Sequence, residues 1–481
     1  MKKLSVLLFT CSLSLCFTNQ MFSQFSPVGA AIEGEVAGER FGISLAMNAS
    51  GTILAAGAPT IGDTGTNSGE VRVYEYASGA WAQIGQDINS VNPEDRIGKI
   101  LSINATGDRI AIPSPGNSDA GYNAGHVRVF QYQSNLWSQI GQTIEGTVPD
   151  ELLGASVALS ADGNTLAVGV PHVNVNGPYG GLVKIFRLEM NQWEPLGTIL
   201  YGTGSGDFFG KALDLSQDGN TIAIGDKRNE GSITIYHYDG VNWQQRGNTI
   251  SSPPDHYNGA DNAIRISEDG YTVAGIYHGF INNEGALVGL VYKFDGTFWN
   301  NVGSELRETG FVGGTLNNCF DINATGKVVA IGRYGSNALG EDSPGTTLVS
   351  QKINDDWVTV GSGIDGENAN DLSGHAISFN AVGNIIAIGS PGNNNNGENA
   401  GQVRVFITED LSVNDPLDIL DITFFPNPVN DILIISTKEQ QEIESITVYT
   451  LLGQEVLTQH GNSELEISMD LKSLQAGSYL L

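Results

Sequence analysis

Positive charge is scarce in this sequence. Only 23 residues are Lys or Arg, against 53 Asp or Glu, and the formal net charge is −30 at pH 7. Nucleic acids and anionic membrane surfaces bind through clustered Lys and Arg, so this balance argues against both as partners. The simplest explanation of this negative charge is solubility outside the cell. The more specific alternative is that the acidic residues bind calcium or a cationic partner.

Cysteine is scarce too, with three residues in the chain, two of them before residue 20. The run from 4 to 17 is apolar, follows two lysines and is too short for a stable membrane anchor. We expect residues 1–24 to be a signal peptide. The mature chain then keeps only Cys319, holds no internal disulfide, and buries this thiol as a small hydrophobic side chain.

What the sequence has in place of these residues is a repeat. A turn glycine recurs at intervals of 51 to 57 residues, at Gly51, Gly107, Gly163, Gly219, Gly270, Gly326 and Gly383. All six tryptophans follow one of these glycines by 24 to 31 residues, at Trp81, Trp137, Trp193, Trp243, Trp299 and Trp357. A period of this length indicates repeated structural units.

Each unit has the pattern of four short β-strands. In the first unit, residues 41–47 alternate in polarity, 53–57 form an apolar run, and 71–76 and 81–88 follow. Tight turns ending in glycine join the first two segments and allow a positive φ. Four antiparallel strands at this period are typical of a propeller blade, so the sequence predicts an all-β, seven-bladed β-propeller.

The seventh unit lacks a fourth strand, and the mature N-terminus offers a match for it. Residues 25–34 align with 137–146, and Phe25 takes the place of the tryptophan. Phe25 precedes the next turn glycine by 26 residues, the spacing that the tryptophans of the first two units also show. We therefore predict that the N-terminal strand pairs into blade seven and closes the ring.

The tryptophans are expected to fill the space between adjacent blades, with an aromatic ligand platform as the alternative. The repeated glycines are expected to serve as turn and bulge residues. No glycine-rich stretch opens a helix, which excludes a phosphate-binding loop.

The units resemble the FG-GAP family of propeller blades, known from integrin α-subunit heads and bacterial surface proteins. The motif residues are Phe41-Gly42, Gly57-Ala58-Pro59 and Phe209-Gly210, with weaker copies at Leu153-Gly154 and Gly389-Ser390-Pro391. The resemblance covers residues 25–407 and implies adhesion. The calcium loops of that family are not carried over, because the corresponding connections here are tight turns without spaced Asp residues. We expect no metal and no cofactor.

One face of the propeller is expected to carry long, variable loops, the usual layout of a binding surface. The candidate residues offer hydrogen bonds and stacking to a polysaccharide or a protein, and they are Asp63, Asn67, Asp119, Tyr122, Asn123, Asn174, Tyr179, Asp255 and His256. The alternative is that these loops are solvated connections. Around Asp255 and His256 a metal or acid–base site is conceivable, but a divergent fifth blade without a ligand motif is the simpler interpretation.

The end of the chain has a different pattern. A linker is expected over 408–421, and short strand signals over 422–481 fit a small β-sandwich. This segment resembles the type A C-terminal sorting domain of the type IX secretion pathway, through Pro426, Asn427, Pro428, Asp431, Gly453 and Gly477. The resemblance implies contact with the type IX machinery and a secreted or cell-surface location. Because that family usually continues into a final strand and a basic tail, we expect either that the domain is truncated at Leu481 or that this copy cannot be exported fully.

The leading hypothesis is therefore an exported, monomeric, non-enzymatic binding or adhesion protein for an extracellular polysaccharide or protein. The rival is a propeller hydrolase or lyase with a site in the central channel. Such an enzyme should direct charged side chains inward from the innermost strands. Most of these strands carry packing residues, and the exceptions are Asp214, Arg265 and Asp321.

Overall fold

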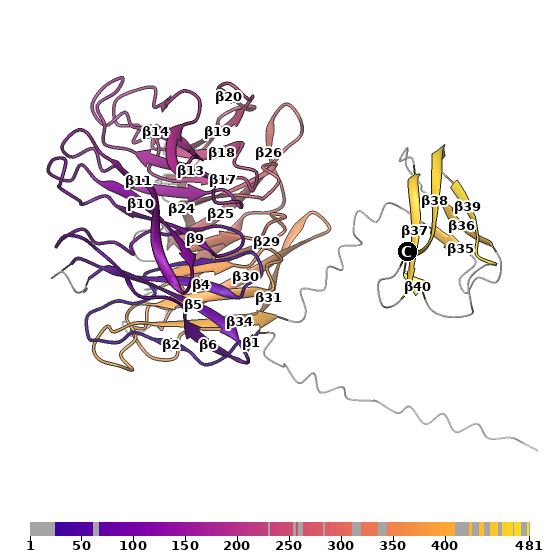
Figure 1. Ribbon diagram of the computed structural model, residues 1–481, viewed down its shortest axis with the longest axis horizontal. Helices are drawn as coiled ribbons and strands as arrows, with labels where there is room; N and C mark the ends of the chain where they lie inside the picture. The colour runs from indigo at the N-terminus through magenta and orange to yellow at the C-terminus, as the bar shows by residue number, and fades with distance from the viewer. Residues whose placement is uncertain are drawn as a thin grey trace, which may run out of the picture. The chain divides into compact units, whose positions relative to one another are not determined.

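The computed structural model describes residues 25–480 except 61–66, 229–230, 254–255, 258–262, 282–283, 310–318, 335–343, 409–422, 426–431, 437–442, 451–454, 465 and 473–478. The chain divides into two units, Met1–Leu411 and Ser412–Leu481 (Figure 1). The described residues form no α-helix. Among them there is accordingly no helix that is long and apolar enough to cross a membrane.

The first unit is the predicted seven-bladed β-propeller, built from seven antiparallel sheets. Blade one contains β3 (Ser44–Met47), β4 (Ile53–Ala58), β5 (Glu70–Ala77), β6 (Ala80–Gln83) and β7 (Ile88–Asn89). Blade two contains β8 (Ser102–Ile103), β9 (Arg109–Ser114), β10 (His126–Gln133) and β11 (Leu136–Glu145). Blade three contains β12 (Ser156–Leu159), β13 (Thr165–Val170), β14 (Leu182–Glu189), β15 (Gln192–Pro195) and β16 (Leu200–Tyr201).

The remaining blades follow the same order. Blade four contains β17 (Leu213–Leu215), β18 (Thr221–Asp226), β19 (Ser232–Tyr238), β20 (Trp243–Gln245) and β21 (Ile250–Ser251), and blade five contains β22 (His256–Tyr257), β23 (Ile264–Ile266), β24 (Thr272–Ile281), β25 (Glu284–Phe294), β26 (Trp299–Asn301) and β27 (Leu306–Thr309). Blade six contains β28 (Phe320–Ile322), β29 (Val328–Arg333), β30 (Thr346–Ile353) and β31 (Asp356–Asp365). Blade seven contains β32 (Ala376–Phe379), β33 (Ile385–Ser390), β34 (Gln402–Thr408), β1 (Phe25–Pro27) and β2 (Ile32–Glu33).

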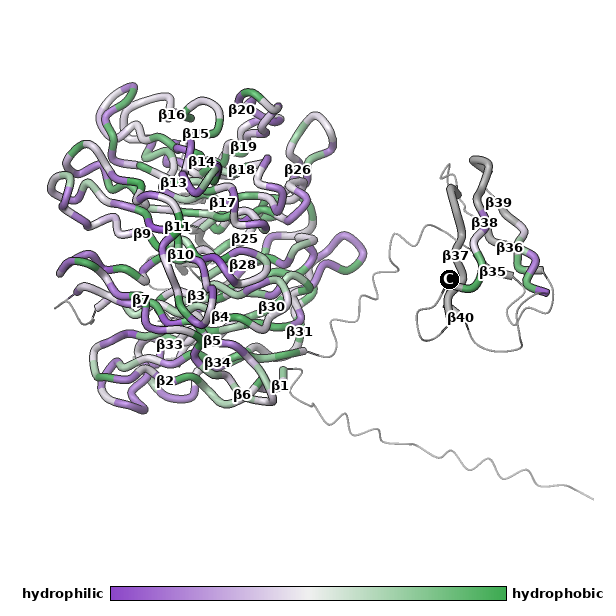
Figure 2. Tube along the Cα trace, in the orientation of Figure 1, coloured by the Kyte–Doolittle hydropathy of each residue, from purple (hydrophilic) through white to green (hydrophobic). Residues whose placement is uncertain are grey.

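The second strand of each blade is the most apolar, and it is buried because neighbouring blades cover both faces of its sheet. β4, with the sequence Ile-Leu-Ala-Ala-Gly-Ala, is buried at every position. Figure 2 shows hydrophobic residues along these central strands and hydrophilic residues in the loops. The expected fourth strand over 81–88 is interrupted between β6 and β7, where Gly85 takes a φ of +71°.

The predicted ring closure is confirmed. Phe25 of β1 pairs with Thr408 of β34, and Ile32 of β2 pairs with Val403 of the same strand. Phe25 is 6% exposed and lies in the hydrophobic cluster between blades six and seven. The two ends of the propeller are therefore joined in one sheet, and no gap with free strand edges separates the first and last blades.

The tryptophans lie between blades, as predicted. Each indole Nε1–H donates to a backbone oxygen in the fourth-strand region of the preceding blade, at 2.7–3.3 Å; the acceptors are Val28, Ile84, Ile140, Leu196, Arg246 and Val302. A glycine follows each acceptor directly and packs against the same ring: a Cβ at Gly85, for example, would lie 2.6 Å from Cδ1 of Trp137. Only glycine fits this close approach at a positive φ.

The turns between the first and second strands meet around the channel. Their backbones form a closed ring of hydrogen bonds, each residue donating its N–H to the next at 2.9–3.0 Å, in the order Ala49, Ala105, Ala161, Gln217, Glu268, Ala324, Ala381 and back to Ala49. All seven turn glycines take a positive φ, between +66° and +87°. These turns therefore act in tight reversals and in joining the blades.

The second unit consists of two three-stranded sheets, consistent with a small β-sandwich. One contains β35 (Thr423–Phe425), β36 (Ile432–Ser436) and β39 (Glu466–Asp470); the other contains β37 (Ile443–Thr450), β38 (Glu455–Glu464) and β40 (Tyr479–Leu480). The sorting-motif residues named above lie outside the described residues.

Candidate binding site on the loop face

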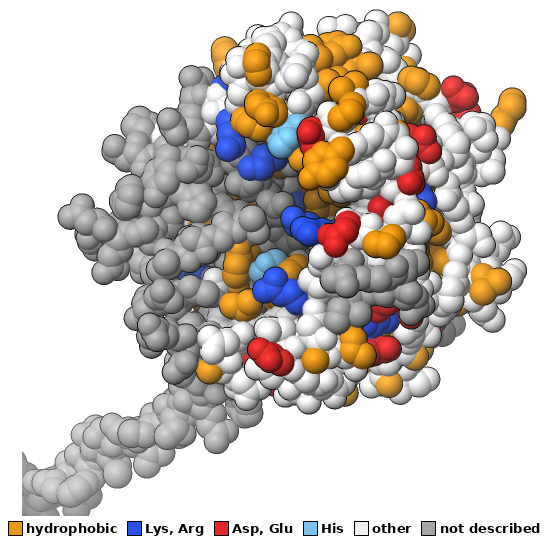
Figure 3. Space-filling model, turned by 90° about the vertical axis from the view of Figure 1, so that its left-hand side faces the viewer, with side chains coloured by type: hydrophobic (Ala, Val, Ile, Leu, Met, Phe, Trp, Pro, Cys, Tyr) orange, Lys and Arg blue, Asp and Glu red, His pale blue; other side chains and the backbone are white. Residues whose placement is uncertain are grey.

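The long loops lie on one side of the propeller, which we call the loop face. It carries the connections between the second and third strands of each blade and those between successive blades. Figure 3 looks onto this face, where hydrophobic side chains, histidines and Lys or Arg side chains lie close together. The short turns between the other strands lie on the opposite side (Figure 1).

Two predicted site residues hold neighbouring blades together. Asn67 and Asn123 take positive φ values of 57° and 49°. Their backbone oxygens accept hydrogen bonds from the N–H groups of Arg96 and Leu152 in the next blade, at 2.9 and 3.2 Å. Asn tolerates this left-handed backbone well, so both residues have a structural role on the loop face.

The other predicted residues are spread over several loops. The Asp119 carboxylate accepts from Asn92 Nδ2 at 3.0 Å and from Asn117 Nδ2 at 3.1 Å. Tyr122 is 69% exposed, and the Asn174 Oδ1 accepts the Tyr179 N–H at 3.0 Å. These contacts organise the loops, and they do not bring the predicted residues into one pocket.

The predicted residues of the fifth blade are only partly described. Asp63 in blade one and Asp255 lie outside the described residues, and His256 pairs with Gly279 in the sheet through β22. Within the described parts of the chain, no group of three or more His, Cys, Asp or Glu side chains could hold a metal ion.

The structure brings Tyr179 together with three residues that sequence reasoning missed. Its ring stacks on Phe208, with centroids 5.4 Å apart and planes at 7°. His172 meets both rings edge-on, at 5.3 and 5.5 Å, and Lys227 Nζ lies 5.0 Å from the Phe208 centroid. We call these four residues the aromatic cluster. It joins loops of blades three and four.

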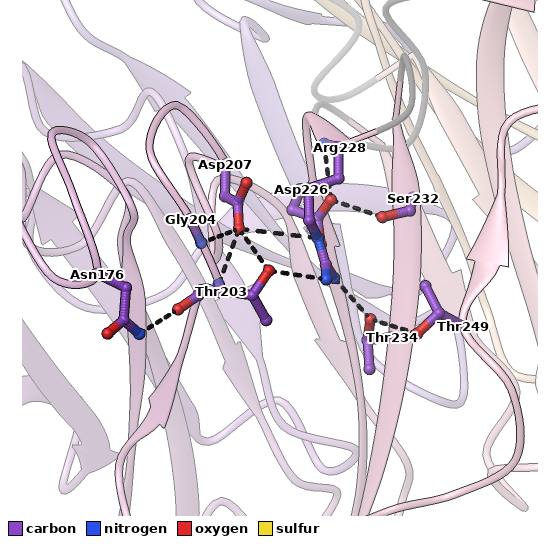
Figure 4. Close-up of polar contacts among 10 residues, drawn as sticks. Asn176, Thr203, Gly204, Asp207, Asp226, Arg228, Ser232, Thr234 and Thr249 are labelled. Atoms are coloured by element: carbon purple, nitrogen blue, oxygen red, sulfur yellow. Dashed lines mark hydrogen bonds and ion pairs between the residues drawn. The ribbon is translucent and has the colours of Figure 1, made fainter.

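The loops under the aromatic cluster are held by a polar network (Figure 4). The Asp207 carboxylate accepts the N–H groups of Thr203 and Gly204, both at 2.8 Å, which fixes the loop that carries Phe208. The buried Asp226 carboxylate binds Arg228 side-on, with Nε at 2.9 Å, and this contact raises the pKa of Arg228. Lys227 lies next to this pair in the chain.

Backbone hydrogen bonds then tie the three loops to one another. Lys227 N–H donates to the Asp207 oxygen at 2.7 Å, and Phe208 N–H donates to the Tyr179 oxygen at 2.9 Å. Burial lowers the pKa of His172 below its ordinary value, Lys211 and Lys227 lower it further, and Asp150 raises it by less than burial lowers it, which favours the neutral imidazole at pH 7. The cluster is thus a preorganised group of three rings, with Lys227 over Phe208 and Lys211 close enough to act on His172.

A second candidate site lies in the central channel. A cavity of about 270 Å³ is lined by the innermost strands of all seven blades, and it contains Asp214, Arg265 and Asp321. Arg265 Nε donates to Asp321 Oδ1 at 2.9 Å. Protein surrounds the cavity, and the resulting desolvation raises the pKa of Asp214 to about 6 and also raises that of Asp321.

Both channel carboxylates bind the backbone of the next blade. Asp214 accepts the Ile266 N–H at 2.9 Å, and Asp321 accepts the Phe379 N–H at 2.7 Å. At the same strand position, Ser102 and Ser378 accept N–H groups of their next blades, at 2.9 and 3.0 Å. The innermost strand is a sheet edge whose N–H groups need partners, so these carboxylates do the same work as the serines.

Comparison with known proteins identifies the end of the chain. Residues 423–481 match the family described as a secretion system C-terminal sorting domain. The chain is therefore an exported propeller protein, sent by the type IX secretion machinery to a secreted or cell-surface location. No curated protein matches the chain.

Several solved structures align with the chain at low similarity. A Bacteroides uniformis protein provisionally assigned as a 6-phosphogluconolactonase aligns with a TM-score of 0.48 and 12% identity, over 68% of this chain and 86% of its own. The Pseudomonas aeruginosa periplasmic gluconolactonase PpgL aligns with 0.47 and 15%, over 68% and 86%. The Dos1 propeller aligns with 0.46 and 11%, over 80% and 96%. Similarity this low carries no information about activity.

Proposed function

We propose that this exported propeller is a non-enzymatic binding protein that presents its loop face to an extracellular polysaccharide or protein. The observation that carries the proposal is the aromatic cluster, a preorganised group in which the exposed Tyr179 packs on the half-buried Phe208 and His172, on the face that holds the variable loops. Exposed aromatic residues on a rigid scaffold are typical of binding surfaces. The FG-GAP type of the blades, adhesion and a monomeric state stay predictions in this proposal.

The second candidate function is an enzyme in the central channel, and the raised pKa of Asp214 favours it. The hydrogen bonds of the two channel carboxylates, Asp214 and Asp321, argue against an enzyme. Their oxygens accept backbone N–H groups and the Arg265 guanidinium, as a structural acceptor would. A general base or nucleophile needs a lone pair directed at the substrate.

The full-length chain should be tested on glycan and protein arrays, and each bound polysaccharide should then be incubated with it and examined for shortened products. We expect binding without turnover. Turnover that Asp214→Ser abolishes would overturn the proposal in favour of a channel enzyme. Turnover that survives in Asp214→Ser would overturn both the binding-only proposal and the channel site.

A further inference from the structure

We infer that Tyr179 and Phe208 form the stacking platform of a carbohydrate site at the junction of blades three and four, which takes a neutral hexose. This inference rests on the proposed binding function and names the surface and the ligand class. Four observations carry it: a departure from the repeat, the backbone geometry, the exposure of the rings and the surrounding charge.

The departure from the repeat is specific to this junction. At the position of Tyr179, three other blades carry Asn, at Asn67, Asn123 and Asn399. At the position of Phe208, four other junctions carry Arg or Leu, at Arg40, Arg96, Leu152 and Leu372. Only between blades three and four, among the described junctions, are both positions aromatic.

The left-handed backbone at these two positions makes an aromatic side chain energetically unfavourable. Tyr179 and Phe208 take φ values of 56° and 50°, a left-handed conformation that Asn tolerates and bulky side chains disfavour. Packing elsewhere does not require the aromatic rings, because the other blades form the same inter-blade contact without them. The bulky residues Leu152 and Leu372 also take a positive φ at the Phe208 position, so the unusual strain is that of Tyr179, which replaces the Asn of the other blades. Strain kept at this position of one blade indicates a role for the Tyr179 side chain itself.

The exposure of the pair leaves part of Tyr179 available. Lys227 Nζ lies over the Phe208 ring, and the Tyr179 ring stacks on it. Tyr179 remains 47% exposed, so a large part of this residue is accessible to a ligand, while Phe208 beneath it is half-buried. The Tyr179 N–H donates to Asn174 Oδ1, and the Phe208 N–H donates to the Tyr179 backbone oxygen. These bonds hold both backbones in place, so a ligand meets a platform that is already formed.

The chemistry of this platform suits a sugar ring. The C–H groups on one face of a pyranose carry slight positive charge and lie favourably on the negative face of an aromatic ring. The neutral His172 at the ring edges adds a hydrogen-bonding group for hydroxyls. Aromatic groups with a few polar partners are the usual composition of small-ligand sites.

The charge around the platform decides between neutral and acidic sugars. Two cations lie near the rings: Lys227 lies over Phe208, and Lys211 and Lys227 both act electrostatically on His172. Asp150 also lies near His172, and the whole chain carries a net charge of −30. A polyanion would be repelled by this field over long range, so a neutral polysaccharide is the ligand that fits.

The test uses two substitutions that restore the residues of other blades, Tyr179→Asn and Phe208→Leu, in the full-length chain. Matched controls on the opposite side of the propeller are Tyr271→Asn and Phe298→Leu, at residues that are 44% and 56% exposed. The probes are hexasaccharides of glucose, mannose and galactose, with alginate hexamers as the acidic counterpart, measured by calorimetry. Melting temperatures of all variants are measured in parallel.

We expect a neutral hexasaccharide to bind, and we expect each site variant to weaken it by about tenfold or more while both controls bind like the wild type. Tyr179→Asn should keep or raise the melting temperature, since Asn suits this backbone. A residue with a merely structural role would lower the melting temperature and leave the affinity unchanged.

Three results would overturn the inference. If the site variants bind the neutral sugar as tightly as the wild type, the platform is wrong and the proposed binding function stands. If only alginate binds, the ligand class is wrong. If arrays show a protein partner and no glycan, the inference falls while the binding function survives, whereas turnover of a polysaccharide without tight binding removes both.

Discussion

The indole Nε1–H of Trp81 donates a hydrogen bond of 2.8 Å to the backbone oxygen of Val28. Trp81 belongs to blade one, and Val28 follows the strand that completes blade seven. The same bond recurs at the other five tryptophans, so the junction between the two chain ends is built like every other junction. The propeller is closed by strand pairing and by the same tryptophan contact that joins its interior blades.

Removal of the closing segment should destabilise the propeller strongly. Deleting residues 25–33 removes the pairing of β1 and β2 with β34 and leaves Trp81 without its acceptor. The smaller change Phe25→Ala should cost about 3–5 kcal/mol, because this ring is 6% exposed in a packed cluster. Thermal and urea unfolding measure both effects. Phe298→Ala, at a 56% exposed ring, is the control, and an unchanged melting temperature in the deletion would exclude ring closure.

The glycine that packs against each tryptophan ring should not tolerate substitution. At Gly85, a Cβ would lie 2.6 Å from Trp137 Cδ1, and φ is +71°. Gly85→Ala should therefore cost about 1 kcal/mol for the backbone and roughly 1–3 kcal/mol more for the steric clash. Gly79→Ala is the matched control, because φ is +87° there and nothing lies within 4 Å. Equal losses in chemical unfolding would show that the contact with Trp137 does not matter.

The channel carboxylate should give stability an unusual pH dependence. The pKa of Asp214 is raised to about 6 in the folded chain, against an ordinary value of 3.8. Between these values the folded state holds a proton that the unfolded state has lost, so this group stabilises the fold at low pH. Its contribution falls as pH rises, by roughly 1 kcal/mol per unit.

Asp214→Ser tests this dependence, since serine accepts the equivalent hydrogen bond at Ser102 and Ser378. Unfolding free energies of the wild type and the variant, measured from pH 4 to 7, should diverge in favour of the variant as pH rises. Parallel curves would show that Asp214 titrates in the folded chain as it does in the unfolded one.

A buried histidine should act in the opposite direction. Burial lowers the pKa of His375 to about 4, against an ordinary value of 6.5. The ring lies 4.6 Å from that of Tyr334, and its Nδ1–H donates to the Ile43 oxygen at 3.2 Å. Its stabilising contribution is complete above pH 6.5 and is lost as pH falls toward 4.

His375→Gln keeps a donor for this bond and removes the titration. The variant should therefore lose less stability than the wild type between pH 6.5 and 4, as measured by unfolding in urea at each pH. A variant that loses stability as steeply as the wild type would assign the acid sensitivity to other groups.

The repeat itself could be predicted because it is a pattern of residue spacings along the chain. Glycines that permit a tight turn and tryptophans that fill a gap recur at a fixed period, and a fourth-strand pattern at Phe25 falls in the same register. Where local geometry overrides the pattern, prediction was less accurate. The expected strand over 81–88 is interrupted, since Gly85 must turn its backbone toward Trp137.

The candidate site could be predicted only in part. Tyr179 stands out in the sequence as an aromatic residue in a polar loop, but Phe208 and Lys227 do not. A comparison of the residues two positions before Gly42, Gly98, Gly154, Gly210 and Gly374 would have shown Phe208 as the one aromatic residue among Arg and Leu. Its contact with Tyr179 could not be read from the chain, because the two belong to different blades.

The secretion domain, the seven blades and the segment that closes them can all be recognised along the chain, because period, turn chemistry and motif are properties of neighbouring residues. Which side chains meet between blades follows from the three-dimensional packing of the sheets. Inter-blade packing brings Tyr179 onto Phe208 and turns Asp214 toward the backbone of Ile266. These contacts depend on the angle between sheets, which no local pattern encodes, and they separate a candidate binding site from structural residues of the same type.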